Sequence, residues 1–563
     1  MDFYSDIIDE IKKSKLDSKQ VNRLKNKYAK KYSLKKIPTN ADILLHADPK
    51  DIKNINLMTK PTRTLSGVAP IALMCKPHKC PHGTCIYCPG GPESIFGDVP
   101  QSYTGNEPST MRSMRNFFDP YLIVFNRLEQ YIILNQNPEK VEIIIQGGTF
   151  LSLDDEYKQS FVMYIFKAMN DFSEFFYKDD EFDYVKFKKF FELPGNIYDK
   201  ERTKRVQKKL LDLKKKSTLD IEKKRNETVK IRCVGLTIET KPDWGLLKQG
   251  LEMLNYGCTR VELGAQSTDE KIQKITNRGH GIKETIDSTR ILKDLGFKIN
   301  YHMMPGLPLS NPKKDLEMLK ETIDDPRFRP DMFKIYPTMV MKGTALFKMW
   351  QKGKYNALER EQAADIIADF MGHVPYYIRI MRVQRDIPTN VTEAGVDRTN
   401  LRQYVDKKLI EKNIVCKDIR SREAGLLSRN EKIDDSDVEI FVEEYSASEG
   451  TEFFISIEDK ERRAIFGYCR LRFPSESLTK EITDKTGLVR ELHVVGVATA
   501  IGEDGKTQHR GFGKKLLNKA ENICKENDKI KLVVISGVGV REYYKKMGYV
   551  DDGFYVSKEL RNC

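Results

Sequence analysis

The sequence has no run of about eighteen apolar residues, so we expect no helix that crosses a membrane. Its first residues, MDFYSDIIDEIKKSK, carry charges where a secretory signal has an apolar core, and this predicts a cytoplasmic protein. Cysteine is scarce, with ten residues in 563, and cytoplasmic thiols stay reduced. A fold held together by disulfides is therefore not expected. No solenoid repeat is apparent either.

Acidic residues are fewer than basic ones, 82 against 96, which gives a formal net charge of +14. A surplus of this size favours a polyanionic partner such as a nucleic acid. The segment KNKYAKKYSLKK, residues 25–36, places lysines around Tyr28 and Tyr32, which share one face of a helix. These rings can stack on unpaired bases, or they can pack beneath an ordinary solvated helix face. The sequence leaves both interpretations open.

The pattern of apolar residues divides the chain into four parts. Residues 1–60 form a basic helical extension, and 61–390 alternate short β-branched runs with helical segments, as in a parallel α/β barrel. A charged insertion at about 173–230 is either a basic arm for nucleic acid or a solvated helical hairpin. Residues 391–436 are expected to be a linker, and 437–563 to be a second α/β domain. Since chemistry lies at the carboxyl ends of barrel strands, one mouth should gather Gly147, Gly148, Thr149, Glu239, Gln266 and the turn at 302–308.

Four of the ten cysteines lie within fourteen residues, at Cys75, Cys80, Cys85 and Cys88. Three thiolates can bind three irons of a 4Fe–4S cluster, which leaves the fourth iron for S-adenosylmethionine. A four-cysteine zinc site is the rival, and the cysteine spacing alone does not separate the two. Beside Cys85 and Cys88, the third ligand is either Cys80 or Cys75. The strand-helix pattern and the downstream Gly-Gly turn favour the cluster.

A second motif, QHRGFG, occupies residues 508–513 and opens a predicted helix. Its glycines let a pyrophosphate approach unpaired N–H groups at a helix start, and here we expect that of coenzyme A. The plain alternative is an ordinary helix that begins with glycine. Tyr543 and Tyr544 follow the last main strand, where one of them can touch a thioester. Both can equally be structural aromatics.

Further motifs extend over nearly the whole chain: MCKPHKCPHGTCIYCPGGP, QSYTGNEPSTMR, GGTF, IETKPD, GCTRVELGAQS, NRGH, HMMPGLP, KIYPT, RVQRDIP, RELHV, QHRGFG and ISGVGVREYY. In these motifs the chain closely resembles the catalytic subunits of the Elongator complex, in their stand-alone form outside eukaryotes. The resemblance implies an α/β fold in which a partial TIM-like radical-SAM barrel is followed by a GNAT acetyltransferase domain.

The resemblance also implies site residues. The cluster ligands would be Cys80, Cys85 and Cys88, with Cys75 outside the set, and Gly147 and Gly148 would approach S-adenosylmethionine. Lys140 and a tyrosine would have catalytic roles. Since Lys140 belongs to the barrel, acetyl-CoA would lie at the domain boundary, and we expect its acetyl end to reach the barrel mouth. The acetyl-CoA contacts would be Lys140, Glu491, Leu492, His493, Val494, Gly511, Phe512, Gly513, Lys514, Tyr543 and Tyr544.

The implied activity is modification of the wobble uridine in a tRNA anticodon stem-loop. A radical derived from S-adenosylmethionine would take hydrogen from the acetyl methyl group, and the resulting carbon radical would add to carbon 5 of the uridine. Thioester hydrolysis would leave a carboxymethyl group. An external electron donor is then required, and a homodimer is compatible with the sequence. Two alternatives are lysine acetylation by the C-terminal domain alone and a tRNA-binding scaffold without catalysis; a requirement for S-adenosylmethionine and reductant separates them.

Overall fold

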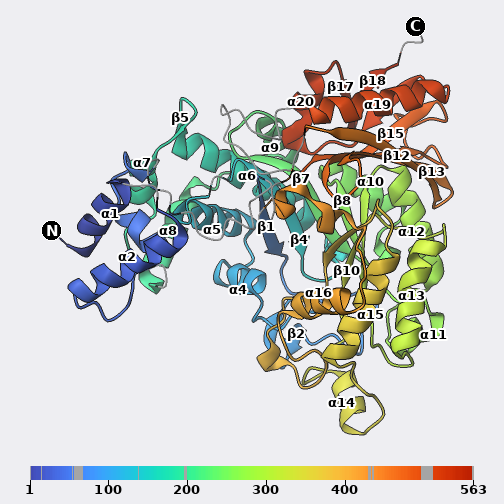
Figure 1. Cartoon of the computed structure of the whole chain (residues 1–563), viewed down its shortest axis with the longest axis horizontal. Coiled ribbons are helices and arrows are strands. Elements are labelled where there is room, and N and C mark those ends of the chain that lie inside the picture. The colour runs from blue at the N-terminus through green and yellow to red at the C-terminus, as the bar shows by residue number, and fades with distance from the viewer. Residues whose placement is uncertain are drawn as a thin grey trace.

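The structure is a computed structural model that describes residues 2–560, apart from 14–15, 53–54, 56, 58–66, 137, 196–198, 429–432, 434–435 and 496–510. It contains two large sheets of seven strands each, and a group of helices near the N-terminus that lies to one side of both (Figure 1). Within the described ranges, no helix combines the length and the apolar character that crossing a membrane demands.

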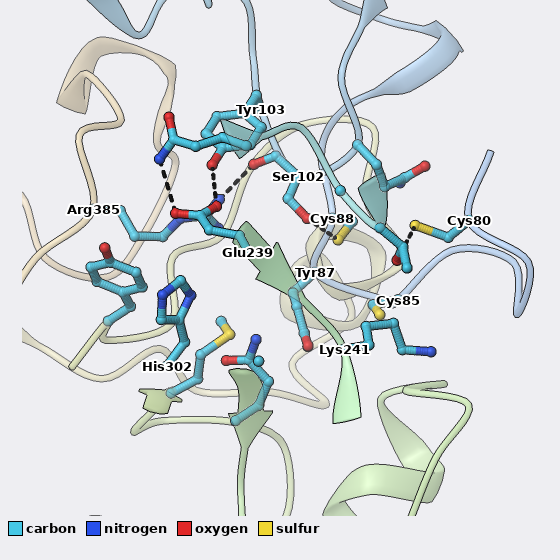
Figure 2. A pocket seen from close by; sticks show the side chains of 18 of the residues that line it. Cys80, Cys85, Tyr87, Cys88, Ser102, Tyr103, Glu239, Lys241, His302 and Arg385 are labelled. Atoms are coloured by element: carbon cyan, nitrogen blue, oxygen red, sulfur yellow. Dashed lines mark hydrogen bonds between the residues drawn. The ribbon is translucent and has the colours of Figure 1, made fainter. Parts of the chain in front are cut away.

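The first large sheet is parallel, and its strands follow one another in chain order. A sheet in which every crossover steps to the next neighbour in the same direction curls into a barrel. Its edge strands are the first and the last, so the barrel is partial, which confirms the predicted fold. The carboxyl ends of the strands surround one pocket (Figure 2). The strands are β1 (Val68–Met74), β4 (Lys140–Gln146), β7 (Arg232–Thr240), β8 (Arg260–Gln266), β9 (Lys298–Met303), β10 (Met332–Ile335) and β11 (Arg379–Arg382).

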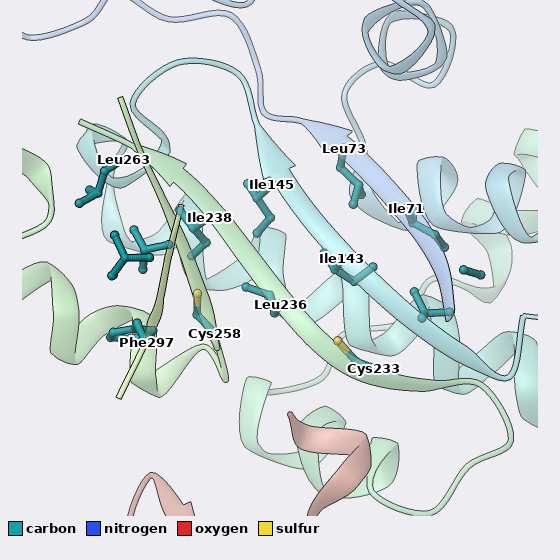
Figure 3. Packing of buried hydrophobic residues seen from close by; sticks show 14 of the residues in the cluster. Ile71, Leu73, Ile143, Ile145, Cys233, Leu236, Ile238, Cys258, Leu263 and Phe297 are labelled. Atoms are coloured by element: carbon teal, nitrogen blue, oxygen red, sulfur yellow. The ribbon is translucent and has the colours of Figure 1, made fainter. Parts of the chain in front are cut away.

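Alternate residues of each strand face opposite sides of the sheet, and the apolar set faces the helices. In Figure 3, Ile143 and Ile145 of β4 lie beside Ile71 and Leu73 of β1, and all four are fully buried. The other β4 positions are only half-buried and face the barrel interior. The helices outside this sheet are α5 (Pro120–Ile133), α6 (Asp155–Phe176), α10 (Leu247–Asn255), α12 (Ile282–Asp294), α13 (Pro312–Asp324) and α15 (Arg360–His373).

The N-terminal helices form a small core of their own and contact the predicted insertion. The amine of Lys188, in the insertion, donates to the carbonyl of Ala47 at 2.7 Å. Tyr28 and Tyr32 pack against the N-terminal core, so the solvated-face interpretation describes both rings. The insertion thus supports the N-terminal helices (Figure 1). The elements concerned are α1 (Phe3–Lys13), α2 (Ser18–Lys31) and α3 (Asn40–His46), with β5 (Tyr177–Lys178), β6 (Glu181–Phe182), α7 (Tyr184–Phe190), α8 (Lys200–Leu213) and α9 (Leu219–Asn226) in the insertion.

The segment expected to be a linker, 391–436, packs against the barrel instead. Its helix α16 (Leu401–Glu411) buries Leu401, Val405 and Leu409 in the same core as α15. Leucine and valine spaced four residues apart give a helix one apolar face, and that face needs a partner. The short helices α17 (Ile419–Arg422) and α18 (Ala424–Leu427) follow. Other short elements are β2 (Gly91–Ser94), β3 (Gly97–Val99), α4 (Pro108–Arg115), α11 (Glu270–Ile275) and α14 (Ala345–Gln351).

The second large sheet is mostly antiparallel, with one parallel pair between β15 and β16. Helix α19 packs across β14 and β15, and its apolar face completes a second core. The elements are β12 (Val438–Ala447), β13 (Gly450–Asp459), β14 (Ile465–Phe473), β15 (Thr486–Val494), α19 (Phe512–Glu526), β16 (Lys531–Val534), α20 (Arg541–Lys545), β17 (Val550–Asp552) and β18 (Tyr555–Glu559).

The two sheets meet at the amino ends of the barrel strands. Arg490 of β15 donates at 2.8 Å to the carbonyl of Phe297, just before β9, and binds both carboxylate oxygens of Asp331, just before β10, at 2.7 and 2.8 Å. Its guanidinium also donates to Glu452 at 2.7 Å. The three charged side chains of this network are fully buried. The C-terminal domain therefore closes the end of the barrel that lies opposite the pocket.

Candidate functional site

Three of the four clustered cysteines line the pocket at the carboxyl ends of the barrel strands (Figure 2). Cys80, Cys85 and Cys88 lie in the loop after β1, and each is less than a tenth exposed. The pocket together with its opening to solvent occupies about 1060 Å³. Among the cysteines that the structure describes, none forms a disulfide. The other lining residues include Gly148, Thr149, Glu239, Gln266, His302 and Met304, so most of the residues expected at one mouth are brought together there.

Cys75 lies apart from the other three. It is not among the pocket-lining residues, and its thiol points to the carbonyl of Gly147 at 3.5 Å. A Cβ atom at Gly147 would lie 2.7 Å from this sulfur, and the φ of +119° also requires glycine there. Gly147 thus lets the strand end pass close to Cys75, while Gly148, at φ +101°, lies beside the pocket and its Cβ would be 3.8 Å from Cys80 Sγ.

The arrangement of the sulfurs fits a cluster better than a single zinc ion. Four thiolates around zinc at about 2.3 Å would bring the sulfurs within 4 Å of one another. In the described chain, no three cysteine sulfurs lie within 4.8 Å of one another. A hydrogen bond from Cys88, with His82 and Arg278, lowers the pKa of Cys85, so one thiolate is favoured even before iron binds.

The pocket also contains buried polar atoms without a hydrogen-bond partner among the described residues. They are Gln266 Oε1, His82 Nδ1 and Arg278 Nε. Such orphaned groups cost free energy unless a ligand or water satisfies them. With the three thiols beside them, they fit a cluster together with a polar cofactor such as S-adenosylmethionine.

Part of the pocket wall is a group of charged side chains in the barrel interior. Glu239 accepts a hydrogen bond from Tyr103 at 3.2 Å (Figure 2). It also accepts from Gln146 at 2.9 Å and pairs with Lys334 at 3.4 Å. Lys334 also binds Glu262, which accepts a hydrogen bond from His302 Nε2 at 2.9 Å. The acidic groups and His302 are spaced closely enough for a metal ion, but the ammonium of Lys334 already supplies the cation.

The second candidate site lies in the C-terminal domain, where β15 and β16 part. Their parallel pairing ends at Val489 and Val534, and β15 continues to Val494 without β16 beside it. Helix α19 begins next to this opening, with Gly511 at φ +71° and no side chain of the described residues that caps the helix start. A Cβ at Gly511 would meet nothing within 4 Å among the described atoms. Free N–H groups at an open helix start fit a pyrophosphate.

Several predicted coenzyme A residues lie around this opening, and some do not. Glu491 is paired with Arg470 at 2.9 Å, so β15 offers its backbone there rather than this carboxylate. Tyr543 is partly exposed, and a Cβ at Gly513 would lie 2.5 Å from its hydroxyl. Tyr544 is buried in the domain core and packs on Tyr549, so its expected contact with the thioester is not supported. Leu492, His493, Val494, Phe512 and Lys514 lie on β15 and α19, and Gln508, His509 and Arg510 lie outside the described residues.

Lys140 lies at the domain boundary but not at the barrel mouth. It begins β4 and is paired in register with Arg232, next to the turn at 538–540 of the C-terminal domain. Burial and the charge of Arg232 lower the pKa of Lys140. Gly147 follows the other end of the same seven-residue strand, about 20 Å away at 3.3 Å per residue. The expectation that Lys140 holds an acetyl group at the mouth is therefore wrong in this structure.

Comparisons with known proteins agree with this architecture. Family models match residues 1–65 (ELP3 N-terminal domain), 196–320 (Radical SAM superfamily), 330–411 (Radical_SAM C-terminal domain) and 420–549 (Acetyltransferase (GNAT) family). Membership of the radical SAM superfamily implies a 4Fe–4S cluster and S-adenosylmethionine, and a GNAT domain implies acetyl-CoA.

Full-length relatives are known. The tRNA uridine(34) acetyltransferase of Methanocaldococcus infernus is 41% identical over 98% of both chains. Elongator complex protein 3 of Saccharomyces cerevisiae is 39% identical, over 96% of this chain and 92% of its own. The solved structure of the M. infernus Elp3 with its N-terminus (1–46) deleted has a TM-score of 0.72 at 36% identity, and covers 88% of this chain and all of its own. The chain belongs to the Elongator complex protein 3 family.

Proposed function

We propose that this protein modifies uridine 34 of tRNA with a two-carbon unit from acetyl-CoA. The main support is the set of three buried thiols at the mouth of a radical-SAM barrel whose other end is closed by a GNAT domain. Cys80, Cys85 and Cys88 would hold a 4Fe–4S cluster, which with S-adenosylmethionine would supply a 5′-deoxyadenosyl radical able to take hydrogen from an acetyl methyl group that has reached the barrel mouth. Full-length relatives named tRNA uridine(34) acetyltransferase support the substrate.

The chain's own residues have distinct tasks in this proposal. Cys80, Cys85 and Cys88 bind iron, Gly148 lets the backbone approach the cofactor, and Gly147 lets the strand end pass close to Cys75. The start of α19 at Gly511 holds the pyrophosphate of acetyl-CoA, and Tyr543 lies beside it. Lys140 lies at the boundary between the two domains, where its amine contacts a polar group of acetyl-CoA. An external donor supplies the electron, and the need for reduced thiols is consistent with the cytoplasm.

The test uses acetyl-CoA deuterated at its methyl group, together with S-adenosylmethionine, a reductant and tRNA. We expect deuterium to appear in 5′-deoxyadenosine and the remaining label to appear on the uridine. If acetyl transfer to lysine is the activity instead, it proceeds without S-adenosylmethionine and reductant. Absence of deuterium from 5′-deoxyadenosine, in protein that carries iron and turns over, would exclude acetyl-CoA as the radical's target.

Gly511→Glu should abolish coenzyme A binding. The new carboxylate would stand at the open helix start and repel the pyrophosphate, while residues with a side chain also disfavour φ +71°. Calorimetric titration with coenzyme A measures the loss. Gly511→Ala is the matched control, because it carries the same backbone cost without the charge, and it should retain much of the affinity. Equal affinities of the Glu variant and the wild type would move the pyrophosphate away from α19.

Two lysines of α2 should contact tRNA phosphates. Lys25 donates to Asn40 and Lys31 pairs with Asp6, whereas Lys27 and Lys30 are exposed on the same helix. Replacing Lys27 and Lys30 by glutamine should weaken tRNA binding and lower the log–log salt slope by about 0.7–0.9 per lost contact. Filter binding over a range of salt measures this, with exposed Lys525→Gln in α19 as the control. An unchanged slope would leave α2 as a solvated face.

A further inference from the structure

The loop that follows α11 packs against the cysteine loop. The amide of Ile86 donates to the carbonyl of Thr276 at 3.1 Å, and the amide side chain of Asn277 donates to the carbonyl of Thr84 at 2.9 Å. Gly279 has φ +74°, and a Cβ there would lie 2.4 Å from the Cβ of His82. Residues 276–279 are thereby fixed against 82–86. The residue in the middle of this loop, Arg278, points inward.

The guanidinium of Arg278 lies in a buried space next to Gly264 of β8. Its side chain is buried, and Nη2 donates to the carbonyl of Gly264 at 2.6 Å. A Cβ at Gly264 would lie 2.3 Å from Nη2, so only glycine at this position of β8 leaves room for the guanidinium. The other amino group, Nη1, donates to Cys85 Sγ at 3.6 Å.

The three pocket cysteines differ in their hydrogen-bond partners. Cys80 Sγ lies 3.7 Å from the hydroxyl of Thr149, and Cys88 Sγ lies 3.0 Å from the hydroxyl of Ser102. Cys85 Sγ lies 3.4 Å from His82 Nε2 and also receives the guanidinium. Among the described residues, Arg278 is the one permanently charged side chain that donates to a sulfur of these three cysteines.

We propose that Arg278 is a positioning residue that raises the reduction potential of the cluster through Cys85. One-electron reduction by the external donor adds one negative charge to the cluster and requires no proton. A buried guanidinium at hydrogen-bond distance from a ligand sulfur stabilises the more negative form, and hydrogen bonds to ligand sulfurs are known to set such potentials. The low dielectric of a buried site strengthens the effect. This inference rests on the cluster in the proposed function, but not on the substrate.

The experiment is a redox titration of reconstituted full-length protein, followed by electron paramagnetic resonance without tRNA or acetyl-CoA. Arg278→Gln should keep its iron and sulfide but lower the midpoint potential, so that the ratio of reduced to oxidised cluster at a fixed potential falls about tenfold, which corresponds to about 59 mV for one electron. Arg278→Lys, which keeps the charge, should lie between Arg278→Gln and the wild type. Exposed Lys274→Gln, a neighbouring charge removal that touches no cysteine, should leave the potential unchanged.

Gly264→Ala gives an independent variant, because its methyl group displaces the guanidinium without removing the charge from the chain. It should shift the potential in the same direction as Arg278→Gln. A wild-type potential in iron-loaded Arg278→Gln would overturn the proposal. If Arg278→Gln assembles no cluster, Gly264→Ala and Arg278→Lys decide: a lowered potential in them supports the proposal, whereas unchanged potentials, or empty protein in both, make Arg278 a structural clamp and overturn it. Wild-type protein that binds no iron would instead refute the cluster itself.

Discussion

Replacing Cys85 by serine is expected to remove the cluster, and with it all cleavage of S-adenosylmethionine. A cluster held by three thiolates has no spare ligand, and a serine hydroxyl is a poor substitute for a thiolate that iron prefers. The change is nearly isosteric at a site that is only 3% exposed, so the fold should remain. Iron and sulfide analysis of anaerobically prepared protein, followed by detection of 5′-deoxyadenosine, measures the effect.

Cys75→Ser is the matched control for this experiment. Cys75 is also fully buried and lies in the same segment, but its sulfur faces Gly147 rather than the pocket. It should retain most of its iron and most of its activity. Cys80→Ser and Cys88→Ser should behave like Cys85→Ser. Full cluster content in Cys85→Ser, or the loss of cluster only in Cys75→Ser, would refute the ligand set.

Arg490→Met should destabilise the protein by about 3–5 kcal/mol, because it leaves two buried carboxylates without the cation that they share. Asp331 and Glu452 are both fully inaccessible and both bind this guanidinium. Glu452 keeps its ion pair with Arg472 at 3.0 Å, whereas Asp331 is left with the more distant Arg470 at 3.6 Å. Since whole domains are stable by only about 5–15 kcal/mol, the loss should be visible as a large shift of the urea midpoint.

Arg463→Met removes an arginine of the same domain whose side chain is 75% exposed, and it serves as the control. It should change the free energy of unfolding by less than about 0.5 kcal/mol. A loss below 1 kcal/mol in Arg490→Met would mean that Asp331 and Glu452 find water or another cation, and that the junction between the domains opens readily.

The sequence predicts much of the barrel and of the cysteine site. In the sequence, Gly147 and Gly148 follow a β-branched run, and two glycines at a strand end predict a close approach of the backbone to a ligand or another segment. In the structure both have positive φ. Cys85 and Cys88 are recognisable by spacing alone. Spacing alone does not choose between Cys80 and Cys75, because both precede the pair; the family resemblance implied Cys80, and in the structure Cys80 lines the pocket while Cys75 does not.

Other features depend on contacts between distant parts of the chain. Arg278 lies 193 residues from Cys85, and nothing in NRGH shows which way its side chain points. Arg470, Arg472 and Arg490 occupy alternate positions of strands, a pattern that ordinarily indicates a solvated face. Here that face is covered by the barrel, so these arginines are buried. The helix α16 was missed for a related reason, since its short apolar face lies in a segment rich in charge.

The placement of Lys140 and Gly147 at opposite ends of one strand has a thermodynamic consequence. Until the acetyl group reaches the barrel mouth, ligands held at the two ends do not touch, so any influence of one on the other's binding must pass through the strands and the polar side chains between them. Reciprocity then requires that S-adenosylmethionine change the dissociation constant of acetyl-CoA by the same factor as acetyl-CoA changes that of S-adenosylmethionine. A factor of one would define the barrel as a passive spacer between two independent sites. Any other factor gives, through its logarithm, the coupling free energy between the two sites. Two titrations measure this factor before any uridine is supplied.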